Sequence, residues 1–63
     1  MNHIKEVREH LRISQIELAR KAGVSQPFLC DLENNRRGAK PETYQRIAES
    51  MGVDVSEITE RAG

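Results

Sequence analysis

Cysteine is nearly absent from this 63-residue sequence, because Cys30 is the only one. A single thiol excludes both an intramolecular disulfide and a cysteine-rich metal site, which is typical of proteins in a reducing compartment. His3 and His10 are the only histidines and lie seven residues apart, so they do not suggest a metal site either. We therefore expect no metal and no cofactor.

Long apolar runs are also missing. No stretch approaches the length of a membrane span, and the first ten residues, MNHIKEVREH, lack the apolar core of a signal peptide. These absences favour a cytoplasmic protein without a membrane partner. The sequence also lacks a nucleophile–base set, a pair of carboxylates in a pocket pattern and a phosphate-binding loop. A chain this short leaves little room for a cleft, so we expect neither an enzyme nor a small-molecule site.

The sequence also has no net charge, since ten Lys/Arg balance ten Asp/Glu. The charges are nevertheless unevenly distributed: residues 1–40 carry eight Lys/Arg and five Asp/Glu, whereas residues 41–63 carry two and five. A chain polarised in this way can present a basic face while remaining neutral overall. Apolar residues make up 37% of the sequence and recur throughout, which favours a small folded domain over a disordered chain.

Apolar spacing predicts five short helices within one domain, residues 1–63, and no segment alternates as a strand would. The motifs SQIE at 14–17 and DVSE at 54–57 are capping boxes that predict helix starts, and Ser25 is a third candidate cap. Pro27 fits the first turn of the helix after Ser25. Gly23 and Gly52 predict helix ends, and Asn35 suits a left-handed position after the third helix. The residues expected to face the core are Ile4, Val7, Leu11, Leu18, Ala19, Ala22, Leu29, Leu32, Tyr44, Ile47, Ala48, Met51 and Ile58.

The third helix has a polar face opposite its apolar one. At 100° per residue, Leu29 and Leu32 lie together and should face the core. The opposite side carries Gln26, Pro27, Cys30, Asp31 and Asn34, with Phe28 on one flank. The turn at Gly23 is too short for the second and third helices to lie antiparallel, so the third should project from the body. A projecting helix can enter the major groove of DNA, where glutamine can pair with adenine N6 and N7.

Two further features converge on that side. The start of the second helix, at Ser14 and Gln15, offers free amides to a phosphate. Arg36, Arg37 and Lys40 follow the third helix, where they can reach the adjacent DNA backbone.

The segment SQIELARKAGVSQPFLCDLENNRR resembles the helix-turn-helix of the XRE family, the lambda-repressor-like domains of phage repressors and small bacterial regulators. The family's small alanine falls on Ala19 and its turn glycine on Gly23, within a helix-turn-helix unit at about residues 15–34. The likeness continues through KPETYQRIAESMGVDVSEI, which is similar to the family's fourth and fifth helices. It implies an all-α, five-helix lambda-repressor-like fold.

The resemblance also implies roles for particular residues. It implies a phosphate-side contact for Gln15, base or groove contacts for Ser25, Gln26, Pro27, Phe28 and Asp31, and backbone contacts for Asn34, Arg36 and Arg37. It further implies a structural ion pair between Arg8 and Glu33, beneath the third helix.

Several positions keep alternative interpretations. Pro27 can only shape the helix start or touch a thymine methyl, and Asp31 can accept from cytosine N4 or repel phosphate. Phe28 is either a base reader or a packing residue that covers Leu32. Cys30 is either a redox switch or a small tolerated residue. Arg12 replaces the usual glycine or asparagine after the first helix and costs about 1 kcal/mol if its φ is positive.

Two functions fit these observations. The first is a sequence-specific transcriptional regulator, a repressor that binds a palindromic double-stranded operator as a homodimer. The alternative is an antitoxin-like module of a toxin–antitoxin pair, which binds a protein partner and for which DNA binding is secondary.

Overall fold

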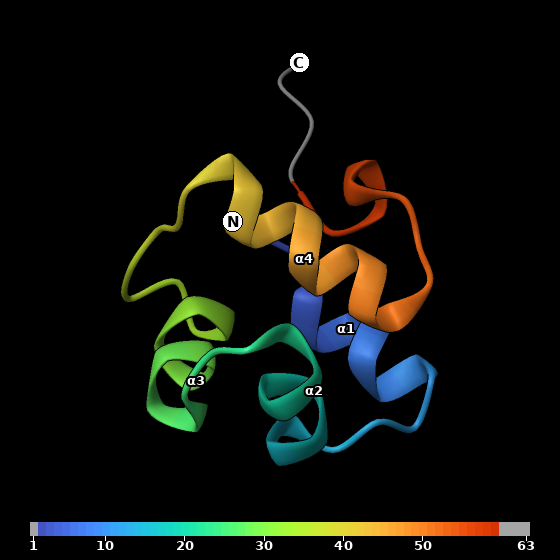
Figure 1. Cartoon of the computed structure of the whole chain (residues 1–63), viewed down its shortest axis with the longest axis horizontal. Helices are drawn as coiled ribbons and strands as arrows, with labels where there is room; N and C mark the ends of the chain where they lie inside the picture. Colours follow the sequence, from blue (N-terminus) through green and yellow to red (C-terminus); the bar gives the residue numbers. More distant parts are fainter. Residues whose placement is uncertain (1, 60–63) are drawn as a thin grey trace.

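The computed structural model describes residues 2–59, and this part of the chain contains four α-helices and no strand longer than an isolated bridge. The helices are α1 (Ile4–His10), α2 (Gln15–Ala22), α3 (Gln26–Glu33) and α4 (Pro41–Met51) (Figure 1). None of the helices in these residues is long and apolar enough to cross a membrane.

The predicted fifth helix is reduced to one 3₁₀ turn, η1 (Val55–Glu57). Its capping box forms in full, because the Asp54 side chain accepts from Ser56 N–H at 2.9 Å and the Glu57 carboxylate accepts from Asp54 N–H at 3.1 Å. Thr59 forms an antiparallel bridge with Asn2, so the chain becomes extended directly after the turn. Ile58 is therefore buried beside the turn rather than within a helix.

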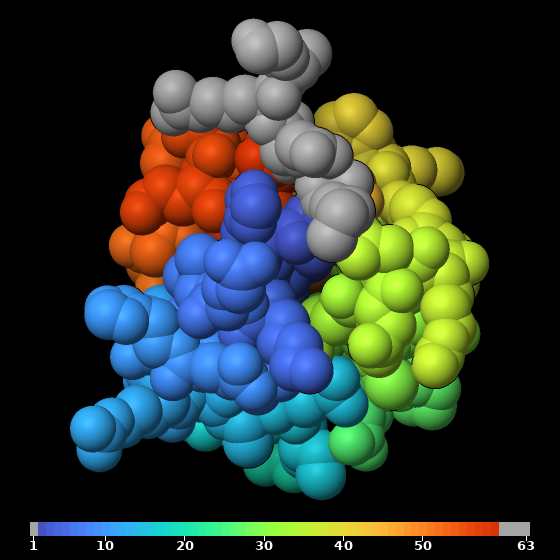
Figure 2. Space-filling view, turned by 180° about the vertical axis from the view of Figure 1, so that it is seen from behind, coloured from blue at the N-terminus to red at the C-terminus, as the bar shows by residue number. Residues whose placement is uncertain are grey.

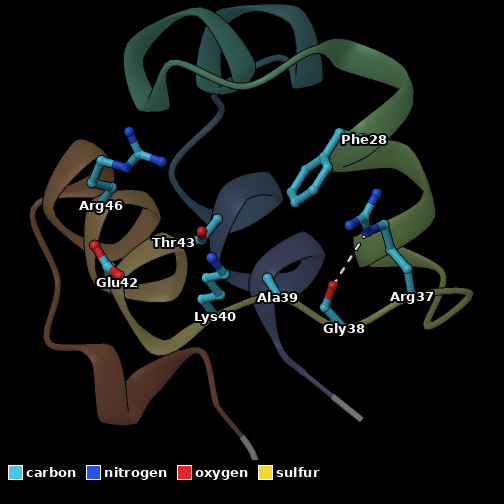
Figure 3. Close-up of a pocket in the computed structure, with 8 residues that line it drawn as sticks. All are labelled: Phe28, Arg37, Gly38, Ala39, Lys40, Glu42, Thr43 and Arg46. Carbon is cyan, nitrogen blue, oxygen red and sulfur yellow. Dashed lines mark hydrogen bonds between the residues drawn. The ribbon is translucent and has the colours of Figure 1, made fainter.

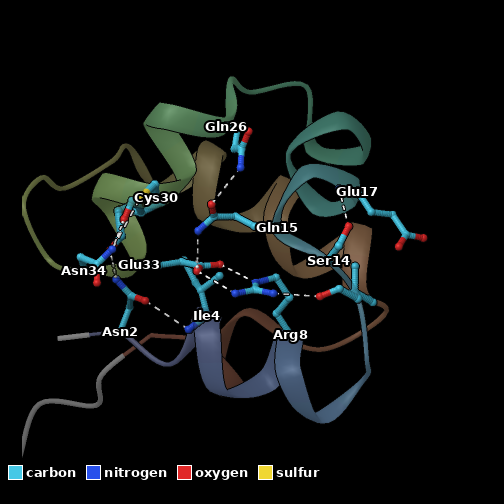
Figure 4. A network of polar contacts seen from close by, with 12 residues as sticks. Asn2, Ile4, Arg8, Ser14, Gln15, Glu17, Gln26, Cys30, Glu33 and Asn34 are labelled. Carbon is cyan, nitrogen blue, oxygen red and sulfur yellow. Dashed lines mark hydrogen bonds and ion pairs between the residues drawn. The ribbon is translucent and has the colours of Figure 1, made fainter.

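Short-range signals define the other helix ends. Ser14 Oγ accepts from Glu17 N–H at 3.0 Å, and Ser25 Oγ accepts from Phe28 N–H at 3.1 Å. The Glu17 carboxylate points away from this cap, so only half of the predicted SQIE capping box forms (Figure 4). At the other end of α2, Gly23 has a φ of +72°, as predicted for a left-handed helix stop.

The core lies between α2, α3 and α4, with α1 across the back of the molecule (Figures 1 and 2). Ten apolar side chains are buried in it: Ile4, Leu18, Ala19, Ala22, Leu29, Leu32, Ile47, Ala48, Met51 and Ile58. Val7 and Tyr44 are half-buried against this cluster. The prediction for Leu11 was wrong: it follows the end of α1 and remains 40% exposed.

Two non-glycine residues adopt left-handed backbone conformations. Arg12, after α1, has a φ of +60°, and Asn35, after α3, has a φ of +59°. The turn at Arg12 redirects the chain toward α2 directly after Leu11, whose N–H still donates to the Val7 carbonyl at 3.0 Å. Asn35 fulfils the sequence prediction for the position following the third helix.

The N-terminal segment fixes the far end of α3. Asn2 Nδ2 donates to the Leu32 carbonyl at 2.8 Å, and Asn2 Oδ1 accepts from Ile4 N–H at 3.1 Å. One side chain thus satisfies a carbonyl at the end of α3 and an amide at the start of α1. The orientation of α3 is consequently held at its C-terminus by α1 as well as by the apolar core.

Candidate nucleic-acid interface

A three-residue turn, residues 23–25, separates α2 from α3. Gly23 reverses the chain in a left-handed conformation, and Val24 packs against the core while its N–H donates to the Ala19 carbonyl at 3.0 Å. Ser25 then caps α3, and Pro27 lies in its first turn. These local constraints position the N-terminal end of α3 at the surface beside α2 (Figure 1).

The exposed face of α3 is polar. Ser25, Gln26, Pro27 and Asn34 are exposed, while Cys30 and Asp31 are half-buried. We call these six residues the α3 face. On the other side of the helix Leu29, Leu32 and Glu33 are buried. An eight-residue helix spans about 12 Å, and its width fits the major groove of B-DNA, about 12 Å wide.

One flank of the α3 face leads into a polar network (Figure 4). Gln26 Nε2 donates to Gln15 Oε1 at 3.4 Å, and Gln15 Nε2 donates to Glu33 Oε1 at 3.0 Å. The Glu33 carboxylate also accepts hydrogen bonds from Arg8 Nε at 2.8 Å and from Arg8 Nη2 at 3.1 Å. A chain of contacts thus runs from an exposed residue of α3 through α2 to a buried ion pair with α1.

The Arg8–Glu33 ion pair is bidentate and nearly inaccessible to water, with side-chain exposures of 11% and 1%. Arg8 Nη1 also donates to the Ile13 carbonyl at 2.9 Å, in the segment that leads into α2. The hydrogen bonds that Arg8 donates to Glu33 raise the pKa of Arg8 above its ordinary value, against the opposing effect of burial. The contacts of Arg8 therefore connect α1, α3 and the segment that leads into α2.

The opposite flank of α3 is basic and contains a hollow. The Arg37 guanidinium lies 4.0 Å from the centre of the Phe28 ring, and Arg37 Nε donates to the Gly38 carbonyl at 3.2 Å. A cavity of about 600 Å³ lies between this pair and the start of α4 (Figure 3). Its lining residues are Phe28, Arg37, Gly38, Ala39, Lys40, Glu42, Thr43 and Arg46. Three cations and one carboxylate surround it.

The structure brings together most residues singled out in the sequence, but Phe28 does not lie on the α3 face. Its ring is half-buried against the core and is covered by Arg37. Asp31 remains on the face, with Arg36 Nη1 3.5 Å from its carboxylate. Asn34 Nδ2 donates to the Cys30 carbonyl at 2.8 Å, which turns its amide nitrogen back toward the helix.

Sequence reasoning missed three features of this site. Arg46 adds a cation to the basic flank from α4, Asn2 holds the end of α3, and Gln15 contacts Glu33 as well as facing solvent. The partners lie 18 to 30 positions apart in the last two cases, so no local pattern reveals them. No group of three His, Cys, Asp or Glu side chains that could hold a metal ion occurs in residues 2–59.

Comparison with known proteins places this arrangement in a family. The helix-turn-helix family HTH_3 matches residues 4–58. The chain is 34% identical over 55 residues to the immunity repressor protein of Bacillus phage phi105, covering 87% of this chain and 38% of that protein. It is also 34% identical over 53 residues to the ImmF control region 10 kDa protein of the same phage, covering 84% and 59%.

A bacterial relative has a similar likeness. The HTH-type transcriptional regulator DdrOP3 of Deinococcus deserti is 32% identical over 57 residues, covering 90% of this chain and 44% of that protein. The chain thus spans less than two thirds of the length of each of these relatives. With its buried HTH core and capped, exposed third helix, the chain belongs to the XRE family of lambda-repressor-like helix-turn-helix domains.

Proposed function

We propose that this protein is a sequence-specific double-stranded DNA-binding repressor of transcription. The observation that carries the proposal is the α3 face, a polar, exposed helix surface backed by buried Leu29 and Leu32. The names of its relatives, an immunity repressor and transcriptional regulators, support the same role.

In this proposal α3 enters the major groove and Gln26 reads a base. A glutamine amide matches adenine because Oε1 can accept from N6 and Nε2 can donate to N7. Asp31 lies five residues further along α3, on its exposed side, where a carboxylate can accept from cytosine N4. Pro27 supplies an apolar surface for a thymine methyl group.

The two flanks of α3 contact the two phosphate backbones that border the groove. On one flank, the start of α2 presents the Gln15 amide beside Gln26. On the other, Arg36, Arg37 and Lys40 supply cations, with the Arg37 guanidinium positioned by Phe28. Phosphate contacts of this kind set the register of a helix in the groove, while base contacts give specificity.

The size of the reading helix supports a homodimer. An eight-residue helix of about 12 Å covers only a fraction of one 34 Å turn of DNA, which is too short for a long operator. Two copies related by a two-fold axis would read two half-sites about 34 Å apart and double the number of base contacts.

The test is selection from random duplexes at physiological salt, followed by sequencing. The proposal predicts enrichment of a palindrome with half-sites about one helical turn apart. Enrichment of a single half-site would contradict the homodimer but retain DNA reading. If the folded protein enriched no sequence, the repressor proposal would be wrong and a protein partner would become the better explanation.

The basic flank has its own test. Replacement of Arg37 by alanine should weaken binding to all duplexes and reduce the salt dependence of binding by about one phosphate contact. The matched control is Arg20→Ala, which removes an exposed arginine from the last turn of α2. An equal effect of both variants would show that Arg37 acts only through net charge.

A further inference from the structure

The Glu33 carboxylate accepts one hydrogen bond more than its ion pair with Arg8 supplies. This carboxylate is 1% exposed and accepts three hydrogen bonds, two from Arg8 and one from Gln15 Nε2. An ionised carboxylate can only accept hydrogen bonds. Gln15 must therefore direct the NH₂ group of its side-chain amide toward Glu33.

The orientation of the Gln15 amide in turn determines the orientation of the Gln26 amide. With Nε2 of Gln15 held against Glu33, Oε1 of Gln15 faces Gln26 (Figure 4). An amide oxygen is also an acceptor only, so Gln26 must present its own NH₂ group to it, as it does at 3.4 Å. The buried carboxylate thus determines the orientation of two amides, the second of which lies on the α3 face.

The orientation of the Gln26 amide matters to a base. With Nε2 on the Gln15 side, the remaining N–H and Oε1 of Gln26 present a donor and an acceptor in one fixed order across the groove. Adenine offers N7 and the N6 amino group in a matching order, and a reversed amide would set donor against donor. We propose that Glu33, acting through Gln15, is a positioning residue that fixes the Gln26 amide and thereby the base pair that α3 prefers.

The proposal rests on the proposed function, and two variants separate positioning from stability. Arg8→Met/Glu33→Met removes the acceptor-only group without leaving a buried charge, and apolar replacements of a buried ion pair are often neutral or stabilising. Arg8→Lys keeps the carboxylate that faces Gln15 but loses the bidentate geometry and the bond to Ile13. The first variant should release the amides, and the second should retain their orientation in a less stable protein.

The first readout needs no DNA. In ¹H–¹⁵N spectra, the side-chain NH₂ groups of Gln15 and Gln26 should show downfield-shifted, slowly exchanging protons in the wild type and in Arg8→Lys. Both should shift to the positions of the exposed Gln45 amide in Arg8→Met/Glu33→Met. Unchanged Gln15 and Gln26 signals in that variant would overturn the proposal.

The second readout is the ratio of affinities for the selected operator and for the same operator changed at the base pair that Gln26 contacts. Arg8→Met/Glu33→Met should lower this ratio at least about fivefold, toward the value for a site without the bidentate contact. Arg8→Lys should stay within about twofold of the wild type despite its lower melting temperature. If the affinity ratio fell in both variants in proportion to their loss of stability, the Arg8–Glu33 pair would have a purely structural role and the proposal would be overturned. A wild type without any base preference would instead contradict the proposed function, while the amide spectra would still decide whether Glu33 fixes the amides.

Discussion

The Arg8–Glu33 pair makes a quantitative prediction about stability. In Glu33→Ala, Arg8 would lose both bonds to the carboxylate and keep only the one to the Ile13 carbonyl. An uncompensated buried charge of this kind costs about 3–5 kcal/mol. A domain of 63 residues has a total stability of roughly 3–9 kcal/mol. We therefore expect Glu33→Ala to lose about a third or more of the free energy of unfolding.

The double variant Arg8→Met/Glu33→Met should behave differently. Because both charges are removed together and replaced by apolar side chains of similar length, we expect a stability within about 1 kcal/mol of the wild type, or above it. Arg8→Met alone should be as damaging as Glu33→Ala, since it leaves the carboxylate buried with Gln15 as its remaining partner.

The assay is urea unfolding of the three variants and the wild type, followed by helical circular dichroism. We expect the double variant to be more stable than either single variant by about 3 kcal/mol. If the free energy of unfolding of Glu33→Ala lay within about 1 kcal/mol of the wild-type value, the reasoning would be refuted. A loss that small is typical of an ion pair exposed to solvent.

The same urea assay checks four smaller predictions. Arg12→Gly should raise the free energy of unfolding by up to about 1 kcal/mol, because it relieves a φ of +60°, and an unchanged value would mean that this turn carries no strain. Gly23→Ala should lower it by about 1–2 kcal/mol through backbone strain alone, since a Cβ there meets only an Arg46 nitrogen at 4.0 Å. Ser25→Ala should cost about 0.5–2 kcal/mol by removing the cap of α3, whereas Ser25→Asp should cost less. Leu29→Ala should cost about 2–5 kcal/mol because the side chain is fully buried, and a smaller loss would contradict the packing of α3 on the core.

The helix ends could be predicted because their signals are local. Ser14, Ser25 and Gly23 act within three or four residues, so the sequence contains both partners of each contact. Leu11 failed for a related reason. Its spacing from Ile4 predicts the correct helical phase, since its N–H still donates to the Val7 carbonyl, but the chain turns away at Arg12 and leaves the Leu11 side chain exposed.

The predicted fifth helix shows where a local signal is insufficient. The capping box at Asp54 begins a turn, but the bridge between Thr59 and Asn2 ends it after three residues. That bridge joins opposite ends of the described chain. A cap predicts the start of a helix, whereas its length depends on tertiary contacts that sequence spacing does not reveal.

The candidate site divides in the same way. The residues of the α3 face could be placed from helical periodicity, and the Arg8–Glu33 pair followed from the family resemblance. The link from Glu33 through Gln15 to Gln26 could not be predicted from the sequence. An amide has several partners within reach, and only the packing of α1, α2 and α3 selects among them. For Phe28, periodicity allowed both a base contact and packing, and the structure places it beneath Arg37.

The central claim is that the α3 face reads base pairs, and Gln26→Ala tests it most directly. Affinities would be measured for the selected operator and for a random duplex at one salt concentration, with Gln45→Ala as the matched exposed glutamine on α4. We predict that Gln26→Ala loses about 1–3 kcal/mol of binding free energy on the operator and little on random DNA, while Gln45→Ala changes neither. Equal losses on both duplexes, or no loss on the operator, would contradict the claim that this face gives the protein its sequence preference.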